Sequence, residues 1–350
     1  MNFSNEDGLD RDRQKEGGIE MSGVPKLCVV GKIFPAVAVL LGVLLTPCWG
    51  AEDPAKFPSK PITMVIQWAA GGTTDLSGRK IGEIAGKILG QPIVVENKIG
   101  GAGVIGVNAV AKALPDGYTI GTLSASANTQ VPHFRSVPFH PIDDFVFIMA
   151  YCKYAYVCCV LPDSPWKTFK DFIKDAQKNP GKFKYTTPGP LSAPHIVMEH
   201  IFKVEKVKAS HIPVGGSSEA IRQLLGHHVD IATTPDFMPY IRSGKMLPLA
   251  VAENEKRFAA IPDVPTMGEL GYRVELPNWL GIAAPKGLDP RVEKKLFDAF
   301  QKAYSDPSLQ DLMEKLYLQP VLMDTASFTA LVKQEYENQG RVLRELGLVK

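Results

Sequence analysis

The segment Gly71–Asp75, a glycine pair followed by two threonines and an aspartate, is the first in the chain whose residue types could do chemistry. Thr73, Thr74 and Asp75 are residue types that favour the start of a helix. N–H groups in the first turn of a helix have no partner within the helix, and the helix dipole favours negative charge there. The segment therefore predicts an anion site, although an ordinary strand-to-helix turn can have the same composition.

A predicted strand and a predicted helix hold this turn. Ile62–Ile66 is a short apolar run rich in β-branched residues, which predicts a buried strand. After the turn, apolar residues recur at helical spacing as far as Leu89. Gly78, Gly82 and Gly86 recur every four residues in this helix. Because charged residues lie between them, we expect a stripe packed against neighbouring protein and not a membrane contact.

A second glycine-rich segment, Gly100–Gly106, contains the spacing Gly-x-Gly-x-x-Gly after a predicted strand at Ile93–Glu96. A dinucleotide site on such a motif needs an acidic residue about twenty positions further on, where it holds the ribose. The strand predicted at Thr119–Leu123 ends at Ser124 without an acid. We therefore expect no nucleotide cofactor, and a tight loop that gives its backbone to a ligand or to packing.

The second half of the chain alternates predicted helices and strands from Thr168 onward, after a change of composition at Pro162–Trp166. This alternation predicts a second domain with a parallel sheet. The end of the chain, Asp289–Val349, is predicted to be mostly helical. Polar loops follow the strands in both halves, and open α/β sheets bind ligands at that end of their strands.

Ser192, His195 and Asp236 lie in or beside such loops, and a hydrolase triad could be drawn from them. Only the residue types support it. A lone histidine at a helix start is more often a capping or packing residue. The sequence has no nucleophile elbow, Walker loop or His-Glu-x-x-His motif, and its cysteines lack metal-ligand spacing. We therefore expect no catalytic residue and no metal site.

Length and composition allow two domains and a large core: the chain has 350 residues, 45% of them hydrophobic. The net charge is +2 at pH 7, and no cluster of Lys and Arg is dense enough to predict a nucleic-acid binder. Cys152, Cys158 and Cys159 fall in a strand-like run, Tyr151–Leu161, where we expect buried free thiols. A disulfide between Cys152 and one of the others stays open as an alternative in an oxidising compartment.

The N-terminus has the pattern of a secretory signal peptide. Two lysines precede the apolar run Ile33–Leu45, which is too short for a membrane span, and small residues allow cleavage after Gly50. Residues 1–50 are therefore predicted to be an N-terminal extension and signal, with Met21 as an alternative start. Lipid attachment at Cys48 is the weaker alternative, because a proline precedes that cysteine.

Short motifs recur along most of the chain and in combination are specific, although each is weak alone. They are Phe57–Ile62, Ala70–Asp75, Leu89–Asn97, Gly101–Gly103, Pro115–Thr119, Ser192 with His195, Gly226–Asp230 and Ile261–Thr266. Over essentially all of 57–350 the sequence resembles the substrate-binding receptors of tripartite tricarboxylate transporters, the Bug/TctC family.

The resemblance implies an α/β, bilobed type II periplasmic-binding-protein fold, with two doubly wound lobes joined by a hinge of two crossings. Lobe 1 would comprise residues 57–160 and 279–350, and lobe 2 residues 161–278. The ligand would lie between the lobes, and a hinge motion would bury it.

The resemblance also implies a monomeric periplasmic receptor that is not an enzyme. It would bind a small organic carboxylate and deliver it to a permease with a large and a small membrane subunit. A sensor module for a signalling partner, or a hydrolase using Ser192 and His195, are the alternatives. Trp68-Ala69 and Pro190-Leu191 depart from the family pattern, so the ligand's identity is not carried over. The ligand-binding residues that the resemblance implies are Ala70, Gly71, Gly72, Thr73, Thr74, Asp75, Ser124, Ser126, Asn128, Ser192, His195, Gly215, Gly216 and Asp236.

Overall fold

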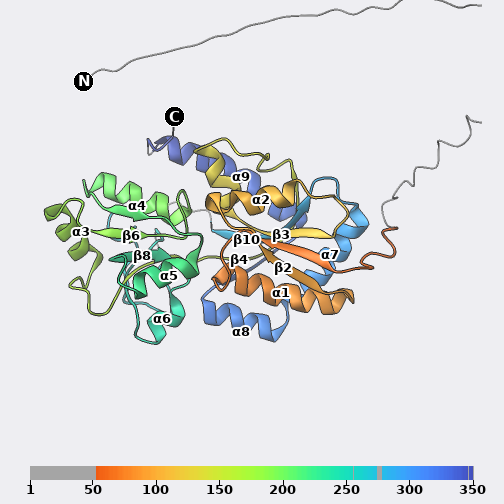
Figure 1. Ribbon diagram of the computed structural model, residues 1–350, viewed down its shortest axis with the longest axis horizontal. Coiled ribbons are helices and arrows are strands. Elements are labelled where there is room, and N and C mark those ends of the chain that lie inside the picture. The colour runs from red at the N-terminus through yellow and green to blue at the C-terminus, as the bar shows by residue number, and fades with distance from the viewer. Residues whose placement is uncertain (1–52, 255, 274–277, 346, 350) are drawn as a thin grey trace, which may run out of the picture. The chain divides into compact units, whose positions relative to one another are not determined.

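A computed structural model describes residues 53–254, 256–273, 278–345 and 347–349. The predicted signal peptide, the alternative start at Met21 and the lipidation alternative at Cys48 lie outside these residues. Among the helices described, none is long and apolar enough to cross a membrane. The described chain contains two β-sheets, each with helices packed on it (Figure 1).

The first sheet has the strand order β11-β4-β10-β3-β1-β2. Its first three strands along the chain are parallel, and β10 returns antiparallel between β3 and β4. Helices α1, α7 and α8 lie on one face and α2 and α9 on the other (Figure 1). Their apolar side chains belong to the two core clusters on those faces. The elements are β1 (Ile62–Ile66), α1 (Thr73–Leu89), β2 (Ile93–Asn97), α2 (Val104–Ala111), β3 (Thr119–Ser124), β4 (Phe145–Lys153), β10 (Trp279–Pro285), α7 (Pro290–Tyr304), α8 (Pro307–Leu316), β11 (Gln319–Met323) and α9 (Thr325–Glu345).

The second sheet has the order β7-β6-β8-β5-β9. Strand β6 pairs in parallel with β7 and β8, whereas β5 is antiparallel to both β8 and β9. The prediction of a parallel second sheet is therefore wrong for β5. The elements are β5 (Val157–Val160), α3 (Phe169–Lys178), β6 (Lys184–Thr186), α4 (Ala193–Val204), β7 (Ser210–Ile212), α5 (Ser217–Leu225), β8 (Ile231–Thr234), α6 (Met238–Arg242) and β9 (Leu247–Val251).

Two further predictions differ from the structure. The run Tyr151–Leu161 is not one strand: it is divided between β4 of the first sheet and β5 of the second. The chain therefore crosses at Tyr154–Tyr156, so Val157–Val160, assigned above to lobe 1, pair within the second lobe. The tail is mostly helical, as predicted, and it also contains an edge strand, β11.

The glycine stripe of α1 packs closely, as predicted. A Cβ added to Gly78 would lie 2.9 Å from Cδ1 of Ile66, and one added to Gly86 would lie 2.9 Å from the carbonyl oxygen of Gln91. In the second glycine-rich segment, a Cβ on Gly106 would lie 2.7 Å from Cα of Gln67. These glycines allow backbones and side chains to approach, which accounts for both motifs by packing.

Cys152, Cys158 and Cys159 are free and buried, which confirms the expectation of buried thiols and leaves the disulfide alternative unsupported. Burial raises the pKa of the Cys158 thiol to about 12, against a smaller lowering by its hydrogen bond with Thr233. A thiol with so high a pKa is protonated at neutral pH and is a poor nucleophile.

Candidate functional site

Loops from both lobes meet around a small buried cavity. Its volume is about 20 Å³, so it has room for little more than one water molecule. Threonine, serine, tyrosine, tryptophan and proline residues line it, and none of them carries a charge. They are Trp68, Thr74, Ser126, Tyr154, Tyr156, Pro188, Ser192, Pro194, Ser217 and Pro235.

Three helices begin at this cavity. Thr74 lies in the first turn of α1, Ser192 is the N-cap of α4, and Ser217 is the first residue of α5. None of these three helices has a side-chain hydrogen bond at its N-cap. Helix N-termini present N–H donors and the positive end of the helix dipole, so this end of the three helices is suited to an anion.

Asp236 of the second lobe reaches across to α1 of the first. Its Oδ1 accepts a hydrogen bond of 2.9 Å from the N–H of Thr73 and another from the Thr73 hydroxyl. Burial raises the pKa of Asp236 to about 6, and the two hydrogen bonds from Thr73 oppose that rise. The carboxylate of Asp236 thus occupies the helix N-terminus that the sequence predicted as an anion site.

Two more contacts hold the lobes together beside Asp236. The Ser218 hydroxyl donates to the carbonyl oxygen of Ala70 at 3.0 Å. A Cβ added to Gly216 would lie 2.9 Å from the backbone nitrogen of Ala69, so the two loops touch. Gly72 also lies close to the other lobe, because its added Cβ would lie 3.1 Å from Oδ2 of Asp236. The lobes are therefore closed on the cavity.

Several residues implied by the resemblance have their side chains engaged within one lobe. Asp75 accepts hydrogen bonds from Arg79, Asn97 and the N–H of Gly71. Burial acts to raise its pKa, but these bonds hold it below the ordinary value. The structure does not bring the side chains of Asp75, Ser124 and Asn128 to the cavity. Ser124 Oγ accepts a hydrogen bond of 3.1 Å from Trp68 Nε1. The side-chain amide of Asn128 donates to the carbonyl oxygen of Pro141 at 2.8 Å.

The contacts of His195 do not assemble a hydrolase triad. Its Nδ1 accepts from the N–H of Leu191 at 3.0 Å, and its ring lies 4.2 Å from that of His211. Burial lowers the pKa of His195. Ser192 Oγ donates to Thr187 Oγ1 at 3.5 Å, and Asp236 bonds Thr73. These contacts are those of a histidine packed at a helix start.

Sequence reasoning missed the aromatic residues of the cavity. Tyr154 and Tyr156 were placed inside a strand-like run, but they form the crossing between the lobes and line the cavity. The Tyr154 hydroxyl bonds Thr74 Oγ1 at 2.6 Å. Two tyrosines in a row of apolar residues indicate a binding site only when the position of the crossing between the lobes is known.

Of the other predicted residues, Thr74, Ser126 and Ser192 line the cavity. Gly215 is directed elsewhere: its N–H donates to Glu219 Oε2 at 2.7 Å. It lines a neighbouring cavity that also includes Trp68.

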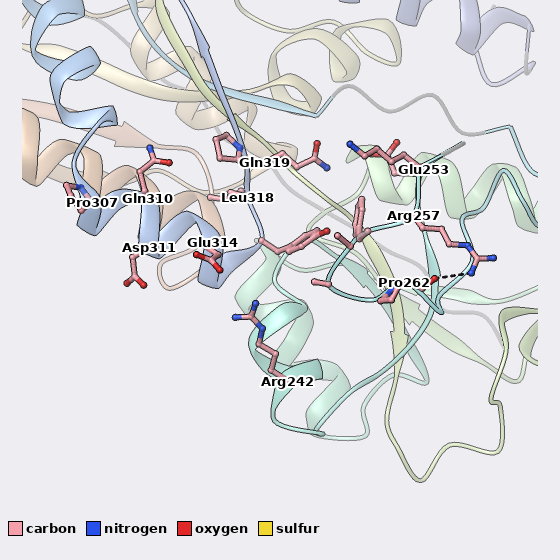
Figure 2. A pocket seen from close by; sticks show the side chains of 16 residues that line it. Arg242, Glu253, Arg257, Pro262, Pro307, Gln310, Asp311, Glu314, Leu318 and Gln319 are labelled. Carbon is pink, nitrogen blue, oxygen red and sulfur yellow. Dashed lines mark hydrogen bonds between the residues drawn. The ribbon is translucent and has the colours of Figure 1, made fainter.

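A much larger hollow, of about 1210 Å³, lies elsewhere, between α8 and the loop around Arg257 (Figure 2). Its rim has both signs of charge: Figure 2 shows Asp311 and Glu314 on α8, Arg242 on α6, and Glu253 near Arg257. It contains none of the residues predicted to bind ligand. Among the described residues, no group of three or more His, Cys, Asp or Glu side chains is arranged to hold a metal ion.

Comparisons with known proteins agree on one family. The model of the tripartite tricarboxylate transporter family receptor matches residues 78–348. A protein of Cupriavidus necator, described as "UPF0065 protein in gbd 5'region", is 36% identical over 316 residues, covering 90% of this chain and 95% of the relative.

Solved structures are similar over most of the chain. The periplasmic binding protein BugD superposes with a TM-score of 0.78 at 31% identity, covering 84% of this chain and all of BugD. MatC from Rhodopseudomonas palustris, with bound malate, gives a TM-score of 0.75 at 25% identity, covering 82% of this chain and all of MatC. The chain therefore belongs to the tripartite tricarboxylate transporter receptor family and has its two-lobed periplasmic-binding-protein fold.

Proposed function

We propose that this chain is an exported receptor that captures a small organic carboxylate between its lobes and delivers it to a tripartite tricarboxylate-type permease. The permease would consist of a large and a small membrane subunit. The receptor would act as a monomer in the periplasm, after removal of the predicted signal peptide. Ligand would enter when the lobes separate and would be buried when they close.

The convergence of three helix N-termini on one cavity without charged lining residues carries this proposal. The Asp236 carboxylate occupies the N-terminus of α1, whereas α4 and α5 have no side-chain hydrogen bond at the N-cap. Backbone N–H groups and hydroxyls can satisfy a carboxylate without a paired cation, because the helix dipoles favour negative charge. MatC, whose structure contains malate, supports an organic acid as the ligand class. The cavity of about 20 Å³ is too small for such an acid, so binding requires the lobes to open or to close around it differently.

A thermal-shift screen of the protein against organic acids and their neutral amides tests the proposal. An acid present at a hundred times its dissociation constant adds about 2.7 kcal/mol to the free energy of unfolding. This gives a rise of a few degrees in Tm for a protein of this size. We expect at least one acid to stabilise and its amide not to. If folded, ligand-free protein responds to no acid, the carboxylate assignment is wrong.

A further inference from the structure

We propose that His195 is a positioning residue of the binding site and makes ligand capture depend on pH. Its neutral imidazole holds the loop at residues 187–192 in the shape that lines the site, and a proton on the ring releases that loop. Ligand is then bound near neutral pH and given up in acid. This inference rests on the proposed receptor function and adds the regulation of the same site.

The loop at 187–192 contributes to two cavities between the lobes. Pro188 and Ser192 line the smaller one. Pro190 and Leu191 line the neighbouring one, whose volume is about 120 Å³. Ser192 is also the N-cap of α4, so the loop sets the position of that helix N-terminus. A change in the shape of the loop is therefore a change in the site itself.

One hydrogen bond joins His195 to the strained point of this loop. The N–H of Leu191 donates to Nδ1 of His195 at 3.0 Å. Leu191 has φ 61°, in the left-handed region that a leucine adopts only at a cost in energy. The imidazole offsets part of that cost because it gives the N–H of Leu191 an acceptor within the protein. Without the acceptor, we expect the loop to relax.

The same bond fixes which ring nitrogen of His195 carries the hydrogen. Nδ1 accepts from Leu191 only while it is unprotonated, so the neutral ring has its hydrogen on Nε2. Nε2 lies 3.9 Å from Oε1 of Glu199, one turn further along α4. The next proton therefore binds at Nδ1, where it meets the N–H of Leu191. A charged ring and the hydrogen bond to the loop exclude each other.

The surroundings of His195 keep its ring neutral while the loop is held. The titratable side chains around the ring are Glu199 of α4, Tyr185 of β6 and His211 of β7, whose ring lies 4.2 Å away. Burial lowers the pKa of His195, against a smaller raising effect of Glu199. Burial and, to a lesser degree, the charge of His195 lower the pKa of His211 to about 4, so His195 takes up the first proton.

The sign of the pH dependence follows from the lowered pKa of His195. When the loop is released, the ring meets water and its pKa returns towards the ordinary value of 6.5. The released state therefore binds a proton more readily than the held state. The held loop is favoured above about pH 6.5 and loses stability as the pH falls below that value.

NMR of the ligand-free protein tests the hydrogen bond itself. In protein labelled with nitrogen-15 histidine and leucine, the Nδ1 signal of His195 should be that of an unprotonated acceptor at pH 7.5. The amide signal of Leu191 should change with the same pKa as the His195 ring. A hydrogen on Nδ1 at pH 7.5, or a Leu191 amide that does not follow the titration of His195, overturns the proposal whether or not any acid binds.

Two substitutions separate the acceptor from the charge. His195→Asn keeps an oxygen near the position of Nδ1 but takes up no proton, whereas His195→Leu removes the acceptor. The probes are malate, succinate and pyruvate, and calorimetry measures their affinities at pH 7.5 and pH 5.5. At pH 7.5, His195→Asn should bind a probe about tenfold more tightly than His195→Leu does.

The pH profile distinguishes this role from a purely structural one. Between pH 7.5 and pH 5.5 the wild type should lose about threefold to tenfold more affinity than His195→Asn loses. The upper limit arises because a histidine one unit below its ordinary pKa is about nine-tenths protonated, which leaves about a tenth of the molecules able to bind. The comparison cancels the titration of the probe and of Asp236, whose pKa is about 6, since both occur in every variant.

His200→Asn is the matched control, because it makes the same change elsewhere on α4. It should keep the wild-type profile. Equal pH profiles for the wild type and His195→Asn overturn the proposal and leave the receptor function standing. If none of the three acids binds at pH 7.5, the carboxylate assignment is wrong for these acids, and the NMR titration alone decides the role of His195.

Discussion

Asp236 is the residue whose ionisation is most closely linked to the contact between the lobes. It is buried, its pKa is raised to about 6 from an ordinary 3.8, and its hydrogen bonds go to Thr73 of the other lobe. A carboxyl whose pKa is higher in the folded than in the unfolded state binds its proton more tightly when folded. Its contribution to stability is therefore present at low pH and is lost as the pH rises through about 6.

We predict that Asp236→Asn removes a pH-dependent part of the stability. A shift of about two pKa units corresponds to up to about 3 kcal/mol. The free energy of unfolding of the wild type should fall by an amount of that order between pH 4 and pH 7, relative to the variant, in urea titrations at each pH. The difference between the proteins is needed because burial also raises the pKa of Glu335, to about 7. Parallel curves for the two proteins would show that Asp236 is ionised throughout.

At the scale of the element, two glycines of α1 give opposite predictions for the same substitution. A Cβ on Gly82 would meet only ordinary contacts, at 3.4 Å from Ile93 and 3.5 Å from Met64 side-chain atoms. A Cβ on Gly86 would lie 2.9 Å and 3.1 Å from backbone atoms of Gln91 and Ile93, which cannot rotate away. Alanine is favoured over glycine in a helix by about 1 kcal/mol.

Gly82→Ala should therefore raise the free energy of unfolding by about 0.5–1 kcal/mol, and Gly86→Ala should lower it by about 1–3 kcal/mol. Each variant is the control for the other, since the helix and the chemical change are the same. Urea denaturation followed by circular dichroism measures both. Equal effects of the two substitutions would mean that α1 does not lie against the β2 turn as described.

Elements with a local signal could be predicted from the sequence, and those set by distant pairing could not. The strand–turn–helix at Ile62–Leu89 follows from apolar spacing and N-cap residue types, and the structure contains it. The antiparallel direction of β5 depends on where the chain crosses between lobes, which periodicity does not encode. Strand β11 is largely exposed and contains Pro320, so it lacks the apolar run of a buried strand.

Some residues of the candidate site could likewise be predicted from local sequence, and others could not. Thr74, Ser126 and Ser192 were found because polar residues follow strand ends. Tyr154, Tyr156 and the bond between Asp236 and Thr73 were not found, because they exist only where the two lobes meet.

At the scale of the whole molecule, the lobes can close as described only if the residue at position 216 has no side chain that meets Ala69. Gly216 precedes α5 with extended backbone, φ 163° and ψ 175°, which any residue adopts. The three heavy atoms nearest to its added Cβ belong to Ala69 of the other lobe, the nearest at 2.9 Å. A methyl group here would hold the lobes apart without disturbing the packing inside either one.

We predict that Gly216→Ala lowers the affinity for the acid at least about tenfold, because apparent affinity falls with the fraction of molecules able to close. Small-angle scattering should show that ligand reduces the radius of gyration of the wild type but not of the variant. The Tm without ligand should stay within about a degree of the wild-type value, because no contact inside a lobe is lost. A variant that binds and compacts like the wild type would show that ligand is held with the loops at Ala69 and Gly216 apart. The contact between these two loops would then not be part of the ligand-bound state.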